Sequence, residues 1–273
     1  MVFKWTLKKI LLVKLLSFNS KLRYSQPMST KKHSIIIGRN PIIDAIENGT
    51  SIDKILLQQG TRGEFEKELR QLTKQHNIPV QFVPKEKLNK ISRANHQGVI
   101  GFASLIPYYK LEDVIPMIYE KSEMPLIVLL DGVTDIRNVG AIARSAEVCG
   151  AHALVIPRKG SAQINEEAIK SSAGALLKIP VCREPSLDAA LTTLELAGVT
   201  IFGSSLGGKQ KVYECDFTQP TAIIMGSEGT GINRDLLRRI ENQFIIPQKG
   251  TTDSFNVSVA TGIILYEVMR QRL

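Results

Sequence analysis

Four polar side chains, set in three separate segments, are the best candidates for chemistry in this 273-residue chain. In the first segment, residues 131–146, Asn138 and Arg144 stand six positions apart, where an apolar stretch gives way to a polar loop and then to a helix beginning near Asn138. An amide from the loop and a guanidinium from the helix can converge on one ligand. On local sequence alone, Asn138 is equally suited to cap the helix, and Arg144 to face solvent.

The second segment is a glycine-rich loop, Met225-Gly-Ser-Glu-Gly-Thr-Gly-Ile232. Glycines let a backbone approach a ligand closely, and backbone N–H groups can hold polar atoms of that ligand. The spacing G-x-x-G-x-G fits neither a Walker A loop nor the dinucleotide fingerprint. A tight strand-to-helix turn explains the glycines as well, but such a turn does not require the carboxylate of Glu228.

The third segment, residues 246–262, leads from small polar residues directly into an apolar helix. Ser254 or Asn256 is placed to cap that helix. The first turns of the helix hold small residues, which allow close packing against another backbone. Each of the three segments is weak evidence when it is taken by itself.

Alternating strands and helices must position these segments. Continuous apolar strands interleaved with helices predict a parallel sheet covered on both faces, and ligands bind beyond the carboxyl ends of such strands. All three polar segments directly follow predicted strands, so we expect one α/β domain over residues 125–273 with its site at that edge. The strands are predicted at 126–130, 153–156, 199–202, 222–225 and 244–246, and the helices near 139–149, 165–173, 187–197, 233–241 and 257–272.

Residues 33–106 are predicted to form a smaller α/β unit. Its first helix begins at Asn40-Pro41, because Asn can cap and Pro suits the first helical position. Residues 107–124 are expected to be a linker with a short helix from Leu111. The strands of the unit are expected at 34–38, 52–57, 78–83 and 98–105.

Positive charge is concentrated at the start of the chain. Of the 35 Lys and Arg residues, eight lie in residues 1–32, which hold no Asp or Glu, so the remainder has 27 basic against 26 acidic residues. The net charge of +9 is therefore no argument for nucleic-acid binding by the rest of the chain. For the tail we consider a disordered arm or upstream translation before Met28, an organelle-targeting segment, or an RNA-binding arm.

Cysteine spacing and hydropathy indicate the type of cellular compartment in which the protein resides. The three cysteines, Cys149, Cys182 and Cys215, are too far apart in the sequence to indicate a disulfide framework or a zinc site. No apolar run in the sequence is long enough to span a membrane. We expect a reduced, cytoplasmic protein, unless the basic tail directs it to an organelle.

Taken together and in order, the three polar segments resemble the SpoU/TrmH family of RNA ribose methyltransferases. Residues 131–145, 225–231 and 254–262 are similar to its first, second and third motifs, and the likeness covers about residues 125–273. The departures are mild: Ile136 and Arg137 stand in a loop where Pro and His are common, and Phe255 where Leu is usual.

The N-terminal unit carries a resemblance of its own. Ile37-Gly-Arg-Asn-Pro41 and His96-Gln-Gly-Val99 are similar to parts of the ribosomal-protein-like RNA-binding domain of bacterial enzymes that methylate a guanosine of 23S rRNA. This resemblance implies RNA as the partner, with Arg39 and His96 as contact residues. Arg234, Arg238 and Arg239, which flank the second segment, are further candidates for phosphate contacts.

The family resemblance also implies the fold and the cofactor. It implies a parallel SPOUT sheet whose C-terminal segment threads a trefoil knot, which sequence patterning alone would not suggest because knots are rare. S-adenosylmethionine would be the methyl donor, held in the knotted loops, and no metal is needed. The residues in cofactor-contacting positions are Ser204, Ser205, Gly226, Ile246 and Phe255.

Asn138, Arg144, Glu228 and Asn256 stand where the family places its active-site polar groups. The resemblance gives Arg144 the task of acting on the ribose hydroxyl. A guanidinium has a pKa above about 12, so we expect Arg144 to orient the hydroxyl and an RNA phosphate that takes the proton, rather than to act as a neutral base. Glu228 is expected to fix Arg144 or a loop backbone, and the two asparagines to orient the ribose.

The implied function is 2′-O-methylation of a ribose, a guanosine of 23S rRNA being favoured by the separate N-terminal unit. The implied assembly is a homodimer whose sites draw on both subunits. Two alternatives stay open: the same chemistry on tRNA, or a non-catalytic RNA-binding or ribosome-assembly protein of the same fold. A nicotinamide dehydrogenase is disfavoured, since no G-x-G-x-x-G follows the first strand of residues 125–273.

Overall fold

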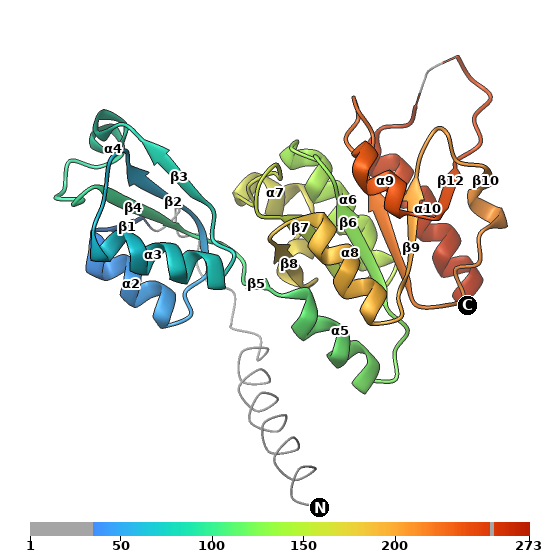
Figure 1. The fold of residues 1–273 in the computed structure, drawn as a ribbon. Coiled ribbons are helices and arrows are strands. Elements are labelled where there is room, and N and C mark those ends of the chain that lie inside the picture. Colours follow the sequence, from blue (N-terminus) through green and yellow to red (C-terminus); the bar gives the residue numbers. More distant parts are fainter. Residues whose placement is uncertain (1–34, 252–253) are drawn as a thin grey trace, which may run out of the picture. The chain divides into compact units, whose positions relative to one another are not determined.

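The computed structural model describes residues 35–251 and 254–273, so the predicted roles of residues 1–32 lie outside the described part of the chain. The N-terminal unit is a four-stranded sheet in the order β1-β4-β2-β3, in which only β2 and β3 run parallel (Figure 1). Its elements are β1 (Ile35–Ile37), α2 (Arg39–Glu47), β2 (Ile52–Gln58), α3 (Glu64–Gln75), β3 (Val80–Val83), α4 (Lys85–Ile91) and β4 (Val99–Ala103).

The C-terminal part is built on an eight-stranded sheet in the order β10-β12-β9-β11-β6-β7-β8-β5, with every pair of neighbours parallel. This confirms the predicted α/β class. The strands are β5 (Tyr108–Tyr109), β6 (Leu126–Leu130), β7 (Ala153–Pro157), β8 (Val181–Glu184), β9 (Thr200–Ser204), β10 (Gln210–Lys211), β11 (Thr221–Met225) and β12 (Asn242–Ile245). The longer helices are α5 (Leu111–Glu120), α6 (Ile136–Val148), α7 (Glu166–Ser171), α8 (Leu187–Leu196), α9 (Arg234–Arg239) and α10 (Val257–Arg272).

Helices cover both faces of this sheet because its central strands are apolar on both sides. Along β6, Val128 packs with α6, α7 and α10, whereas Leu129 packs with α5 and α8. All five residues of β6 are buried, as are all five of β11. This two-sided burial leaves the loops beyond the carboxyl ends of the strands as the polar edge of the domain.

Residues 107–124 are more than the linker that the sequence predicts. Tyr108–Tyr109 forms the edge strand β5, which pairs with β8, and α5 buries Leu111 and Ile115 in the same core as the central strands. The short helix expected from Leu111 is confirmed. The eight-stranded sheet thus begins well before residue 125.

A buried ion pair connects β8 to the N-terminal sheet. Arg183 lies 3.1 Å from an Asp53 carboxylate oxygen, and both side chains are almost completely buried. The Tyr108 hydroxyl donates a 2.6 Å hydrogen bond to the same carboxylate, and the Arg183 guanidinium stacks 3.3 Å from the centre of the Tyr108 ring. Each charge therefore has partners, which a buried charge requires.

The position of β12 is unusual in its connectivity. β9 and β10 follow one another in the sequence, yet β12, which comes later, lies between them. Ser205 N donates to Phe244 O at 2.9 Å, which continues the β9–β12 ladder one residue beyond β9. The loop then crosses close to β12 at Gly208. A Cβ atom at Gly208 would lie 2.4 Å from the Phe244 carbonyl carbon, so only glycine fits this crossing.

Candidate active site

Asn138, Glu228 and Asn256 meet at one point, as the three-segment prediction requires. Asn138 Nδ2 donates a 3.1 Å hydrogen bond to Glu228 Oε1, and Asn256 Nδ2 donates to the same oxygen. Asn256 Nδ2 also lies 3.1 Å from Asn138 Oδ1. Residues 90 and 28 positions from Glu228 thus converge on one carboxylate oxygen.

Helix caps position Asn138 and Asn256. Asn138 is not itself the cap of its helix, which was one of the two roles that the sequence suggested for it. Asp135, not Asn138, caps α6: its side chain accepts hydrogen bonds from the backbone N–H groups of Arg137 and Asn138. Asn138 lies inside the first turn, where its amide is available to Glu228. An acidic residue three positions before Asn138 is the signal that would have located this cap.

Asn256 has two roles at once. Its Oδ1 accepts hydrogen bonds from Ser258 N at 2.9 Å and Val259 N at 3.4 Å, so it caps α10 as predicted. The Nδ2 group of the same side chain points to Glu228. Because the cap holds Oδ1 toward the helix, it also holds Nδ2 toward the Glu228 carboxylate.

The glycine-rich loop that carries Glu228 is tightly closed. Ser227 and Gly231 exchange backbone hydrogen bonds of 3.1 and 3.0 Å. A Cβ atom at Gly226 would lie 2.1 Å from the Gly231 carbonyl carbon, so the loop closes only around glycine. Asp131, which our sequence reasoning did not single out, holds the far end of this loop by accepting a 2.6 Å hydrogen bond from Asn233 N.

A cavity of about 290 Å³ opens beside Glu228. All five residues predicted to contact a cofactor line it: Ser204, Ser205, Gly226, Ile246 and Phe255. Leu206 and Leu237 add apolar walls that the sequence analysis missed, since neither lies in one of the three polar segments. Glu228 belongs both to this cavity and to the amide cluster, so it joins the two parts of the site.

Arg144 lies on α6 six residues beyond Asn138 and is exposed. Within the described residues its side chain makes no hydrogen bond or ion pair. Glu228 is bonded to the two asparagines and not to Arg144, which differs from the first of the two roles we expected for it. Its guanidinium is thus left without a protein partner in the described part of the chain, on the helix that also carries Asn138.

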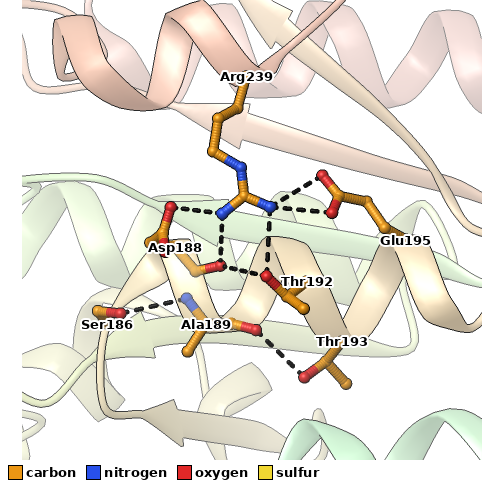
Figure 2. Close-up of polar contacts among 7 residues, drawn as sticks. All are labelled: Ser186, Asp188, Ala189, Thr192, Thr193, Glu195 and Arg239. Carbon is orange, nitrogen blue, oxygen red and sulfur yellow. Dashed lines mark hydrogen bonds and ion pairs between the residues drawn. The ribbon is translucent and has the colours of Figure 1, made fainter.

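Arg239, a predicted phosphate contact, is instead fully engaged by α8 (Figure 2). Its guanidinium bonds to the Asp188 carboxylate and lies 2.9 Å from a Glu195 carboxylate oxygen. Arg238 pairs with Asp235 at 3.0 Å. Asp188 and Glu195 lie about two helix turns apart on α8, so the contact anchors α9 along that helix.

In the N-terminal unit, the two loops singled out by sequence lie together. Arg39 N and Nε donate to the side-chain and backbone oxygens of Gln97 at 3.0 and 3.2 Å. Arg39 is exposed and stacks over Phe65. His96 is 5% exposed, and its ring nitrogens contact Asn89 and Gly98, so the structure places it as a support of this loop. RNA contact by either residue stays a prediction.

Comparison with known proteins agrees with this geometry. Residues 125–266 match the SpoU rRNA Methylase family, and residues 35–109 match the substrate-binding domain of RNA 2′-O ribose methyltransferases. The chain belongs to the SpoU methylase family.

Two relatives illustrate the extent of the likeness. The 23S rRNA (guanosine-2′-O-)-methyltransferase RlmB of Neisseria meningitidis is 35% identical over 229 residues, which is 83% of this chain and 90% of that protein. A TrmH family tRNA/rRNA methyltransferase of Bacillus subtilis is 30% identical over 243 residues, 89% of this chain and 98% of that protein. Both the N-terminal unit and the SpoU domain are therefore shared.

Solved structures support the fold and the cofactor. The SpoU methyltransferase AviRb of Streptomyces viridochromogenes, in complex with AdoMet, aligns with a TM-score of 0.56 at 26% identity, covering 87% of this chain and 90% of that one. An AdoMet-bound rRNA methyltransferase of Sinorhizobium meliloti gives 0.57 at 27% identity, covering 88% and 87%. The SpoU family member described here is thus an RNA methyltransferase that uses S-adenosylmethionine.

The residues of the cavity fit that cofactor. Apolar side chains such as Leu206 and Phe255 suit a purine ring, and the hydroxyls of Ser204 and Ser205 suit the polar parts of the ligand. The carboxylate of Glu228 complements a positive sulfonium. Among the described residues, no group of three or more His, Cys, Asp or Glu side chains is placed to hold a metal ion, and no helix is long and apolar enough to cross a membrane.

Proposed function

We propose that this SpoU enzyme methylates the 2′-hydroxyl of a guanosine in large-subunit (23S) rRNA. The observation that carries the proposal is the convergence of Asn138, Glu228 and Asn256 on one carboxylate oxygen beside the cofactor cavity. The N-terminal match to a ribose methyltransferase substrate-binding domain favours a structured RNA substrate. The Neisseria relative, named for 23S rRNA guanosine, favours that target.

When bound, S-adenosylmethionine supplies an activated methyl group on a sulfonium, so positioning should provide most of the acceleration. The chain must hold the ribose hydroxyl in line and deal with its proton. Arg144, which has no partner among the described residues, is available to bind the hydroxyl and an adjacent RNA phosphate together. The phosphate then takes the proton, and the amides of Asn138 and Asn256 keep Glu228 in place at the cavity wall.

Labelled S-adenosylmethionine tests this function directly. The purified chain is incubated with unmethylated 23S rRNA and, separately, with unmethylated tRNA, followed by nuclease mapping of 2′-O-methyl nucleotides. Label in one guanosine of 23S rRNA is the expected result. Label in tRNA supports the second candidate, which the tRNA/rRNA naming of the Bacillus relative favours. RNA binding without transfer would indicate a non-catalytic protein.

We also propose that the enzyme works as a homodimer through α6 and α10. These helices pack closely on each other, and together they expose apolar side chains: Val148 is 68% exposed, Val259 51% and Tyr266 60%. Arg144 lies one turn before Val148 on α6, so a second copy docked there would approach the site. Light scattering should give twice the chain mass, and Tyr266→Glu should give the monomer; a wild-type monomer would refute the dimer.

A trefoil knot in the C-terminal part is a further proposal. It is supported by the place of β12 between β9 and β10, the order that results when the later strand is threaded through the β9–β10 loop. The close approach of Gly208 to Phe244 lies where this loop crosses β12. An experimental electron-density trace of residues 200–262 decides whether the segment is threaded.

A further inference from the structure

The segment between β7 and α7, residues 158–165, has no role in the site described so far. It leaves the carboxyl end of β7, the strand beside β6. Ala162 N donates a 3.3 Å hydrogen bond to Val133 O in the first polar segment, and Ile164 is buried in the core. Ser161 Oγ closes the turn onto Pro157 O at 2.9 Å. The segment is thus attached to the loop that leads into α6.

Two adjacent cations in this segment lack protein partners. Within the described residues, the side chains of Arg158 and Lys159 make no hydrogen bond or ion pair, and Lys159 is exposed. Nearby Arg137, in contrast, pairs with Glu167 at 3.0 Å. Arg144 is also unpaired. Positive charges that a protein leaves without counter-charges at one edge raise the local concentration of polyanions there.

The row of cations continues on the N-terminal unit. Lys54 Nζ donates a 3.0 Å hydrogen bond to Gln163 Oε1, at the end of the same segment, and lies 5.1 Å from the centre of the Phe102 ring. Burial lowers the pKa of the Lys54 ammonium, the charge of Asp53 opposes this shift, and the charge of Lys87 adds to it. Lys87 lies on α4, which packs through Leu88 against Leu56 of β2, the strand that carries Lys54.

We propose that Arg158 and Lys159, together with Lys54 and Lys87, bind consecutive phosphates of the substrate RNA and direct its strand from the N-terminal unit to the ribose at Arg144. The inference rests on the proposed function and adds to it the course of the strand outside the reaction centre. These cations contact the backbone rather than bases, so they supply affinity and register without sequence preference.

Two double variants test the proposal, each measured against an unmethylated 23S rRNA transcript at several salt concentrations. Arg158→Ala with Lys159→Ala, and Lys54→Ala with Lys87→Ala, should each weaken RNA binding about 10-fold or more. Each should also reduce the slope of log affinity against log salt by about 1.5, because roughly 0.7–0.9 counterions are released per phosphate contact. Cofactor affinity should be unchanged, which separates lost RNA contacts from misfolding.

The matched control is Lys74→Ala with Lys121→Ala, which removes two exposed cations that lie outside this row. The control should bind RNA like the wild type. Wild-type affinity and salt slope in either test variant would overturn the proposed path, and so would an equal loss in the control. Failure of the wild type to methylate any RNA would instead refute the proposed function, so the two failures are distinguishable.

Discussion

Two arginine-bearing helices on opposite faces of the same sheet show how differently one residue type is used. On α9, Arg239 bonds to Asp188, Thr192 and Glu195 of α8 and serves the architecture (Figure 2). On α6, Arg144 has no partner among the described residues. A guanidinium without protein partners remains available for substrate, whereas one with two carboxylates does not. Partners, rather than residue type, separate structural from functional cations here.

Arg183 gives the strongest test of a structural arginine, because its side chain is almost completely buried. Arg183→Ala should lower the free energy of unfolding by about 3–5 kcal/mol, because it leaves the buried carboxylate of Asp53 without its counter-charge. Urea denaturation measures the change. The double variant Arg183→Met with Asp53→Leu should recover much of the loss. A single-variant loss below about 1 kcal/mol would show that water reaches this carboxylate.

Arg144 should show the opposite behaviour, with a large effect on activity and almost none on stability. Arg144→Lys should reduce turnover at least about 100-fold, equivalent to about 2.7 kcal/mol of transition-state stabilisation, since a lysine cannot bind hydroxyl and phosphate with the same fork. Cofactor affinity and the free energy of unfolding should match the wild type. Single-turnover methylation and calorimetry check both parts, and an unchanged methylation rate contradicts the role.

The sequence predicted the elements whose apolar residues form a clear strand or helix pattern. Residues 126–130 and 257–272 were expected as strand and helix with the bounds that β6 and α10 have. It did not predict β8, because Arg183 and Glu184 interrupt the apolar pattern. Their burial depends on Asp53, 130 residues earlier, and on the Leu111 N–H, which donates to Glu184 at 2.7 Å. No local pattern contains such partners.

The same limit applies to the site. The three segments were recognised because their motifs are local, and their convergence followed from the parallel sheet. The cap at Asp135 was missed although its signal is local, whereas the pairing of Arg239 with Asp188 spans 51 residues and required the fold. Sequence reasoning thus identified which groups gather, but not which cations were already paired.

Packing between α6 and α7 supplies a third test. A larger residue at Gly140 should displace α6 without changing any charged side chain of the site. A Cβ atom at Gly140 would lie 2.8 Å from the Ala168 carbonyl oxygen and closer still to Ser171 Oγ. Gly140→Ala should therefore cost about 1–3 kcal/mol of unfolding free energy by overpacking. It should also slow methylation by displacing Asn138.

The control for that variant is Gly250→Ala, since a Cβ atom there meets nothing within 4 Å. Thermal denaturation and initial methylation rates should separate the two variants. If Gly140→Ala is as stable as the wild type, the two helices must separate more easily than their contact indicates.

The smallest effect is expected at Arg239. Arg239→Ala should lower the free energy of unfolding by only about 1 kcal/mol, because its side chain is partly exposed and screened by solvent. RNA affinity should not change, whereas Arg158→Ala with Lys159→Ala should weaken it. Filter binding compares the two variants directly. Weaker RNA binding by Arg239→Ala would mean that the pairing with α8 opens when RNA arrives.

The order in which the three polar segments occur along the chain has a consequence during translation. Asn256, which completes the amide pair on Glu228, and Phe255, which lines the cavity, belong to the segment that the ribosome makes after the other two. A nascent polypeptide that stops short of α10 already contains Asn138 and Glu228 but lacks one of the two amides that bond the Glu228 carboxylate. The cluster beside the cavity is therefore assembled only once this segment has been synthesised.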